Sequence, residues 1–216
     1  MSTERLFRRE QLSVYLVTDP ALCADYGLER TVMDAVSGGA TLIQLRDKHA
    51  TDAELIDIAR RLKQAMAATG VPLVINDRVA VAEASGADGV HLGQDDSDVA
   101  EARRRLGDAA IIGLSVQNLQ QLNELDTAPL DYLGLGPVFA TATKSDHAAP
   151  LGFDGLARLV SASPLPSVAI GGLKAEHTNQ IHQAGADGLA VVSAICGQAD
   201  PRAATQALVE EWGRKP

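Results

Sequence analysis

The stretch VPLVIND, residues 71–77, begins as an apolar run and ends in an amide and a carboxylate. Its apolar residues follow one another without alternation, which is typical of a strand buried on both faces, as in a parallel sheet. Asn76 and Asp77 then close the run, and Arg78 follows them. A charge at the end of a core strand can serve a function if other polar groups lie beside it. The ends of the remaining strands therefore indicate the role of Asp77.

Seven more runs of this kind recur along the chain, with helical patterns between them. The eight predicted strands span residues 13–17, 41–44, 73–76, 89–92, 111–115, 132–135, 168–171 and 189–192. Thr51 and Glu54 form a capping box that opens a helix, and Gly70 is predicted to close it. A last helix is predicted from about Pro201 to Gly213. The segments ASGADGVHLG (84–93) and QAGADGLAVVS (183–193) repeat one turn-and-strand unit.

Eight βα units in 216 residues leave two architectures, a closed (β/α)8 barrel and an open doubly wound sheet. An open sheet of that kind is expected to carry a G-x-G-x-x-G turn after its first strand, but the segment VTDPAL (17–22) contains no glycine. No strand has the pattern of a polar edge, and no linker divides the chain. The sequence therefore predicts an α/β fold, a single (β/α)8 TIM barrel domain over residues 1–216.

Composition restricts the class of protein further. Hydrophobic residues make up 46% of the chain and aromatic residues 3%, so the core must be built from Ala, Val, Leu and Ile. A net charge of −9 argues against nucleic acid as a partner. The charged N-terminus and the lack of a long apolar run argue against a signal peptide and a membrane partner. Cys23 and Cys196 leave a disulfide open and favour two buried thiols. We expect a cytoplasmic protein, and homo-oligomerisation stays open.

In TIM barrels the catalytic groups lie at the carboxyl ends of the strands. Read in this way, the strand ends and the loops after them give one set, whose members are polar except for Gly172 and Val192, which offer backbone N–H groups: Gln44, Arg46, Lys48, Asn76, Asp77, Asp96, Ser115, Thr141, Thr143, Lys144, Gly172, Val192 and Ser193. Taken alone, Asp77 is as well explained by a helix cap, and Arg46 and Lys48 are better explained as solvated charges. The coincidence of the whole set at one end of the barrel is what indicates a site. His91 lies within its strand and is predicted to be a hydrogen-bonded core or supporting residue.

The residues of this set fall into groups with different chemistry. Arg46, Lys48 and Lys144 are cations that converge from two loops. Asp77 and Asp96 are hard oxygen ligands on neighbouring strand ends, able to share one Mg²⁺ that keeps several waters. Cations beside such a pair indicate a diphosphate. The glycine-rich end of the seventh strand and the end of the eighth indicate a second, separate phosphate.

Together these segments resemble the thiamine-phosphate synthases. The resemblance is carried by YLVTD (15–19), QLRDK (44–48), INDR (75–78), GVHLGQDD (89–96), GLS (113–115), GPVFATATK (136–144), PLG (150–152), AIGG (169–172) and VVSAI (191–195). It covers nearly the whole chain in order. It implies an enzyme of thiamine biosynthesis that joins a hydroxymethylpyrimidine diphosphate to a hydroxyethylthiazole phosphate, or its carboxylated form, and releases diphosphate.

The resemblance also implies a role for each residue. The pyrimidine diphosphate would be bound by Gln44, Arg46, Lys48, Asn76, Ser115 and Lys144. The thiazole phosphate would be received by Thr141, Thr143, Gly172, Val192 and Ser193. One Mg²⁺ per site would be held by Asp77 and Asp96. The residues expected to be catalytic are Arg46, Lys48, Ser115 and Lys144.

Two positions depart from the family pattern, and two other functions compete. Many relatives carry proline where this chain has Ala140, and histidine where it has Gln117. A thiazole tautomerase on the same barrel would use that histidine for proton transfer, so Gln117 disfavours it. A non-catalytic barrel that senses thiamine precursors could bind them with fewer charged groups. The presence of both aspartates and all three cations therefore argues for catalysis.

Overall fold

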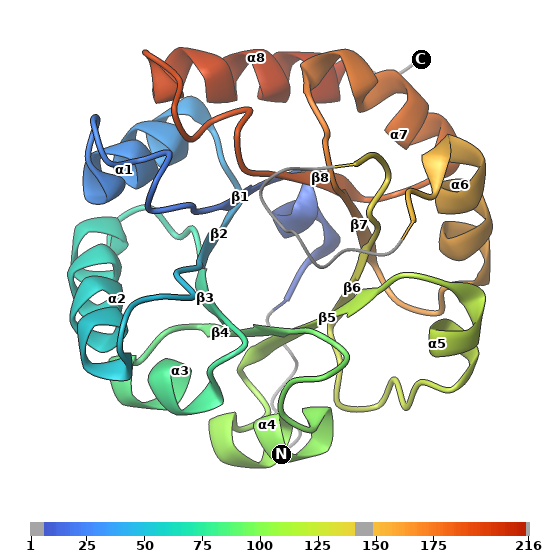
Figure 1. Ribbon diagram of the computed structural model, residues 1–216, viewed down its shortest axis with the longest axis horizontal. Coiled ribbons are helices and arrows are strands. Elements are labelled where there is room, and N and C mark those ends of the chain that lie inside the picture. Colours follow the sequence, from blue (N-terminus) through green and yellow to red (C-terminus); the bar gives the residue numbers. More distant parts are fainter. Residues whose placement is uncertain (1–6, 141–148, 215–216) are drawn as a thin grey trace.

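The computed structural model describes residues 7–140 and 149–214. Eight parallel strands close into a barrel in the order β1 to β8, each paired with its neighbours in the chain and β8 with β1. The helices form a ring around this barrel (Figure 1). The predicted (β/α)8 fold is therefore confirmed. No helix in the described residues has the length and apolarity that crossing a membrane requires.

The strands lie close to where the sequence places them. They are β1 (Val14–Val17), β2 (Leu42–Leu45), β3 (Leu73–Asn76), β4 (Gly89–Leu92), β5 (Ile111–Val116), β6 (Tyr132–Leu135), β7 (Ser167–Ile170) and β8 (Gly188–Val191). Three predicted ranges coincide with the observed strands, and the other five differ by one residue at one or both ends. The helices are α1 (Leu28–Gly38), α2 (Asp52–Met66), α3 (Val79–Ser85), α4 (Val99–Leu106), α5 (Leu119–Asn123), α6 (Gly152–Ala162), α7 (Thr178–Ala184) and α8 (Pro201–Gly213), with 3₁₀ turns η1 (Arg9–Leu12) and η2 (Ala175–His177).

Helix α2 begins as predicted but ends earlier. The Thr51 N–H donates to Glu54 Oε2 at 2.8 Å, and the Glu54 N–H donates to Thr51 Oγ1 at 3.3 Å, which completes the capping box. The helix then ends at Met66 rather than at Gly70. The Thr69 hydroxyl and N–H both donate to the Met66 carbonyl, at 2.8 and 2.9 Å. These local bonds replace the next helical turn, as threonine side chains often do.

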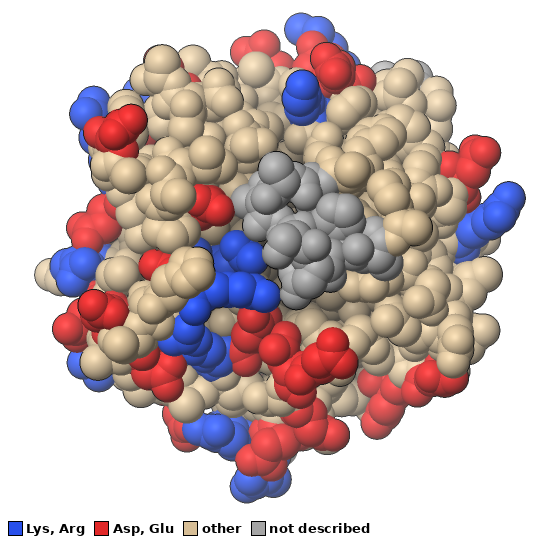
Figure 2. Space-filling view, viewed as in Figure 1, with Lys and Arg blue, Asp and Glu red and all other residues tan. Residues whose placement is uncertain are grey.

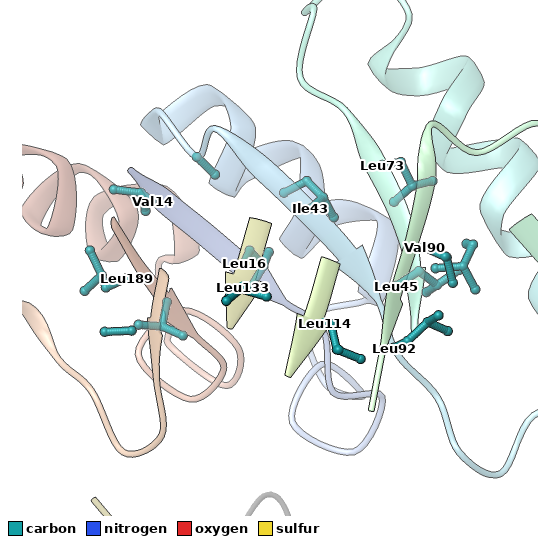
Figure 3. Packing of buried hydrophobic residues seen from close by; sticks show 14 of the residues in the cluster. Val14, Leu16, Ile43, Leu45, Leu73, Val90, Leu92, Leu114, Leu133 and Leu189 are labelled. Carbon is teal, nitrogen blue, oxygen red and sulfur yellow. The ribbon is translucent and has the colours of Figure 1, made fainter. Parts of the chain in front are cut away.

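Two apolar layers hold the barrel. Along β1, Val14 and Leu16 belong to the layer between strands and helices, whereas Tyr15 and Val17 belong to the layer inside the barrel. Figure 3 shows part of the outer layer, in which side chains from several strands point away from the barrel axis. Phe7, before η1, stacks on Tyr132 with ring centroids 5.5 Å apart. The interior is thus packed with side chains, which leaves room for ligands only at the ends of the strands.

A repeated hydrogen bond ties the amino-terminal ends of the strands together. The residue before each even-numbered strand accepts an N–H from the preceding strand: Thr41 from Val14 (3.0 Å), Asp88 from Leu73 (2.7 Å), Asp131 from Ile112 (2.8 Å) and Asp187 from Ser167 (2.8 Å). Each of the three aspartates is also paired with a cation, from Lys63, Arg103 and Arg9 respectively. The repeated GADG unit is therefore structural chemistry at the end of the barrel opposite the polar set.

Candidate functional site

A cavity of ≈ 400 Å³ opens at the carboxyl ends of the strands. Ten of the thirteen predicted site residues line it: Gln44, Arg46, Lys48, Asn76, Asp77, Asp96, Ser115, Gly172, Val192 and Ser193. Thr141, Thr143 and Lys144 lie outside the described residues. Within the described part of the chain, the structure thus brings the whole predicted set to one cavity.

Two carboxylates meet at the rim of this cavity. Burial, followed by hydrogen-bonding and charge interactions with Asp96, raises the pKa of Asp77 to about 6, while the nearby Lys48 and Asn76 act in the opposite direction. Asn76 Nδ2 donates to Asp77 Oδ2 at 2.6 Å, and the Gly93 N–H donates to Asp96 Oδ2 at 2.7 Å. A Cβ at Gly93 would lie 2.7 Å from the same oxygen, so only glycine allows this approach. The pair holds negative charge in a place that favours a cation between them.

The backbone at Asp77 is strained. Its φ of 61° lies in the left-handed region that non-glycine residues rarely adopt. The Asp77 N–H continues the pairing with β4 by donating to His91 O at 2.9 Å, and the next N–H, of Arg78, turns back to Asn76 O at 2.7 Å. The chain therefore turns sharply at the rim, directly after the strand ends. Strain of this kind concentrates at functional sites, where surrounding structure holds it in place.

The carboxylate pair suits magnesium. Mg²⁺ in proteins is commonly bound through one or two carboxylates together with water and substrate phosphate oxygens. The described residues hold no cluster of three or more carboxylate, histidine and cysteine side chains. Within the described residues, Asp77 and Asp96 are therefore two carboxylates of this cavity that could hold such an ion.

Cations line the cavity beside this pair. Arg46 and Lys48 follow β2, and Figure 2 shows basic side chains beside acidic ones near the middle of the face viewed in Figure 1. Sequence reasoning missed Arg78, whose guanidinium fixes the loop that carries both cations. Its Nη1 donates to Ala50 O at 2.7 Å and to Asp52 Oδ1 at 2.9 Å, and its Nη2 donates to the Lys48 carbonyl at 3.4 Å. The INDR segment contained Arg78, but nothing in the sequence distinguished it from a surface charge.

The opposite wall of the cavity is built from backbone. Gly172 has a φ of 64°, and a Cβ there would lie 2.9 Å from Phe139 Cβ, so the turn after β7 requires glycine. Val192 and Ser193 follow β8, where the Ile195 and Cys196 N–H groups both donate to Val192 O, at 3.0 and 2.8 Å. Turns that end strands 7 and 8 of a TIM barrel are the usual place for a phosphate.

Two further predictions concern His91, which lines the cavity, and the two cysteines. His91 is buried and bonded through both ring nitrogens, which confirms the prediction of a satisfied core residue, but its partner Tyr132 was missed. The two cysteines are buried free thiols, as predicted. The structure places them in contact, and the hydrogen bond from Cys196 is the largest cause that lowers the pKa of Cys23 to about 7.

Comparison with known proteins agrees with this geometry. A family model described as thiamine monophosphate synthase matches residues 14–195. A thiamine-phosphate synthase of Psychrobacter sp. (strain PRwf-1) is 53% identical over 207 residues, covering 94% of this chain and 96% of its own. One of Azorhizobium caulinodans is 53% identical over 197 residues, covering 91% and 93%. The structure of a thiamine phosphate pyrophosphorylase from Pyrococcus furiosus superposes with a TM-score of 0.85 at 36% identity, covering 95% of this chain and 97% of the other.

Proposed function

Because this chain belongs to the thiamine-phosphate synthase family and is a transferase, we propose its substrates and the way its site works on them. The first substrate is 4-amino-2-methyl-5-hydroxymethylpyrimidine diphosphate. The second is 4-methyl-5-(2-hydroxyethyl)thiazole phosphate or its carboxylated form. The products are thiamine phosphate and diphosphate, and the reaction depends on Mg²⁺.

One observation carries this proposal: the Asp77–Asp96 pair shares a cavity with Arg46 and Lys48. A carboxylate pair with adjacent cations suits a metal-bound diphosphate, in which the ion bridges protein and substrate oxygens. A site for a monophosphate alone would need the cations but not the paired acids.

The residues of the chain favour departure of diphosphate. Arg46 and Lys48 face the position where negative charge grows as the C–O bond of the pyrimidine breaks. A cation at about 4 Å from a unit charge contributes about 4 kcal/mol of gross attraction at an effective dielectric constant of about 20, and only the part that grows in the transition state accelerates the reaction. Asp77 and Asp96 would hold Mg²⁺, which supplies further neutralisation of the leaving group when it is bound.

The second substrate is held by the backbone wall. Gly172, Val192 and Ser193 would receive the thiazole phosphate and place the ring nitrogen toward the pyrimidine carbon. The electron-rich aminopyrimidine carries the positive charge left by the departing diphosphate, and the thiazole nitrogen then forms the new C–N bond. Neither step requires a strong nucleophile from the protein, in agreement with a polar set rich in phosphate ligands.

The test is an assay of the purified protein with both substrates and Mg²⁺, which measures diphosphate and thiamine phosphate against reactions that omit one substrate. Asp96→Ala should lower turnover by about two orders of magnitude or more, the scale of losing one preorganised electrostatic group. Asp57→Ala, at an exposed position on α2, is the matched control and should leave turnover unchanged. Isomerisation of a thiazole without diphosphate release, or binding without turnover, would overturn the proposal.

A further inference from the structure

A chain of hydrogen bonds crosses the interior of the barrel between two cavity residues. It starts at Gln44, whose Nε2 donates to the Tyr15 hydroxyl at 2.5 Å, and the Tyr15 and Tyr132 hydroxyls lie 2.9 Å apart. The Tyr132 hydroxyl lies 2.9 Å from Nδ1 of His91, and Nε2 of the same ring lies 2.9 Å from Ser115 Oγ. Gln44 on β2 and Ser115 on β5 both line the cavity. The bonding state of one end is therefore connected to that of the other.

The middle of this chain is sealed from water. Tyr15 and Tyr132 are 1% and 0% exposed, and burial raises the pKa of both hydroxyls well above the ordinary value. Each hydroxyl therefore keeps its one proton and donates one hydrogen bond. The space for the Tyr132 ring is built into β5, since a Cβ at Gly113 would lie 2.2 Å from the ring Cζ. With no water to intervene, the direction of one bond fixes the direction of the next.

With a neutral His91 ring, counting protons allows two directions along this chain of hydrogen bonds. In the first, Gln44 donates to Tyr15, Tyr15 to Tyr132, and Tyr132 to His91 Nδ1. The ring proton then lies on Nε2 and is donated to Ser115, whose own hydroxyl proton is left for a ligand, as is the Gln44 Oε1. In the second direction every bond reverses and the Gln44 amide turns over. The cavity then meets the Gln44 amide N–H groups and only the lone pairs of Ser115.

We propose that Tyr15, Tyr132 and His91 are positioning residues that hold the first direction and so determine which substrate groups the cavity accepts. The Gln44 amide stands in the orientation that this direction requires, with Nε2 toward Tyr15. The cavity then takes a hydrogen-bond donor beside Gln44 and an acceptor beside Ser115. The inference rests on the proposed function, because an aminopyrimidine offers an amino donor and ring-nitrogen acceptors. A pyrimidine with an oxo group in place of the amine presents an acceptor where a donor is needed.

The tautomer of His91 is the direct readout. Protein with ¹⁵N-labelled histidine is measured by NMR at about two pH units above the ordinary histidine pKa, and His91→Gln assigns the signals. The wild type should carry the proton on Nε2. Tyr132→Phe removes the donor to Nδ1 and should shift the tautomer ratio about five- to ten-fold, the scale of one net hydrogen bond. Tyr15→Phe keeps the bond from Tyr132 and should keep the tautomer. A wild-type proton on Nδ1 would overturn the inference.

Kinetics give the second readout. Tyr132→Phe should raise the KM for the pyrimidine diphosphate about ten-fold and leave the KM for the thiazole phosphate unchanged. It should also lose about ten-fold of the preference for the amino over the oxo pyrimidine, because a buried polar group that is free to reorient rejects a mismatch less strongly. Tyr26→Phe is the matched control. It removes a tyrosine hydroxyl that donates to Asp34 Oδ2 at 2.5 Å, and Tyr26 does not line the cavity. It should change none of these values.

The outcomes separate this inference from the proposed function. If the wild type releases no diphosphate, the proposed function fails. The His91 tautomer still tests the direction of the hydrogen bonds between Gln44 and Ser115. If the wild type is active but both phenylalanine variants keep its selectivity and its KM for the pyrimidine, the inference is wrong. If Tyr132→Phe does not fold, Tyr15→Phe decides, because it should lose selectivity at the Gln44 end without a change in the His91 tautomer.

Discussion

Asp77→Asn is expected to stabilise the metal-free protein while it removes activity. Burial and Asp96 raise the pKa of Asp77 to about 6 from the ordinary value of 3.8. A difference of about two in pKa corresponds to about 3 kcal/mol of cost for the ionised carboxyl in the folded state. The carboxyl is only half-buried, so solvent screening reduces the expected gain of the variant to about 1–2 kcal/mol.

The pH dependence gives this prediction its sign. The folded protein holds the Asp77 proton up to a pH of about 6, whereas the unfolded chain releases it near 3.8. The stability that the protonated carboxyl contributes is present below the lower value and is lost as pH rises through the upper one. The variant should therefore exceed the wild type in stability by the full amount at about pH 8, and the difference should shrink as pH falls, reaching a constant value only below about 3.8. That constant includes the better tolerance of asparagine for the left-handed backbone.

The measurement is urea unfolding of both proteins across this pH range in the presence of a chelator. Asp57→Asn, which removes an exposed carboxylate from α2, is the matched control and should show no such pH-dependent difference. Added Mg²⁺ should then stabilise the wild type by mass action and leave Asp77→Asn unchanged. A stability difference that is the same at both ends of the range, or a variant less stable than the wild type at the upper end, would refute an electrostatic cost at Asp77.

Three further substitutions and one control variant test other parts of the molecule. Arg103→Met should lower the free energy of unfolding by about 3–5 kcal/mol, because it leaves the buried Asp131 without its cation at 2.7 Å. Arg104→Met on the same helix removes only an exposed pair and should cause no measurable change in urea unfolding. Arg78→Lys should raise the KM for the pyrimidine diphosphate several-fold and leave the KM for the thiazole phosphate unchanged. Lysine cannot reproduce the forked guanidinium contacts that hold the loop carrying Arg46 and Lys48. Ser193→Ala should weaken binding of the thiazole phosphate by about 1–3 kcal/mol as a lost phosphate hydrogen bond, measured as a rise in that KM alone.

The part of the fold that depends on local pattern was predictable from sequence. Apolar runs without alternation located all eight strands, and the ends of those strands located the cavity, because parallel strands in a barrel present their carboxyl ends at one rim. Helix α2 shows where local pattern stops. Gly70 was the obvious terminator, but the Thr69 side chain ends the helix at Met66. A side-chain hydrogen bond of this kind depends on a rotamer that sequence spacing does not determine.

Contacts between distant segments were beyond prediction for a different reason. Tyr15 and Tyr132 read as strand residues, and their hydroxyls meet only because barrel closure brings β1 and β6 within reach across the interior. Cys23 and Cys196 are likewise neighbours only because β8 pairs with β1. In each case the sequence gives the chemistry of the residue and the topology gives its partner.

The two ends of the barrel use the same residue type in opposite ways. At the amino-terminal end, Asp88, Asp131 and Asp187 each accept a strand N–H and each face a cation, so every charge is satisfied within the protein. At the carboxyl end, Asp77 and Asp96 face each other, and their mutual repulsion is relieved only in part by Lys48. Removal of a charge should therefore destabilise the protein at the amino-terminal end and stabilise it at the carboxyl end. For this reason Arg103→Met is expected to lower the free energy of unfolding and Asp77→Asn to raise it. Because the closed sheet makes both ends part of one cooperative structure, the favourable ion pairs at the amino-terminal end can offset the electrostatic cost at the carboxyl end. The site can therefore keep a pair of carboxylates whose charge is neutralised only when its ligands bind.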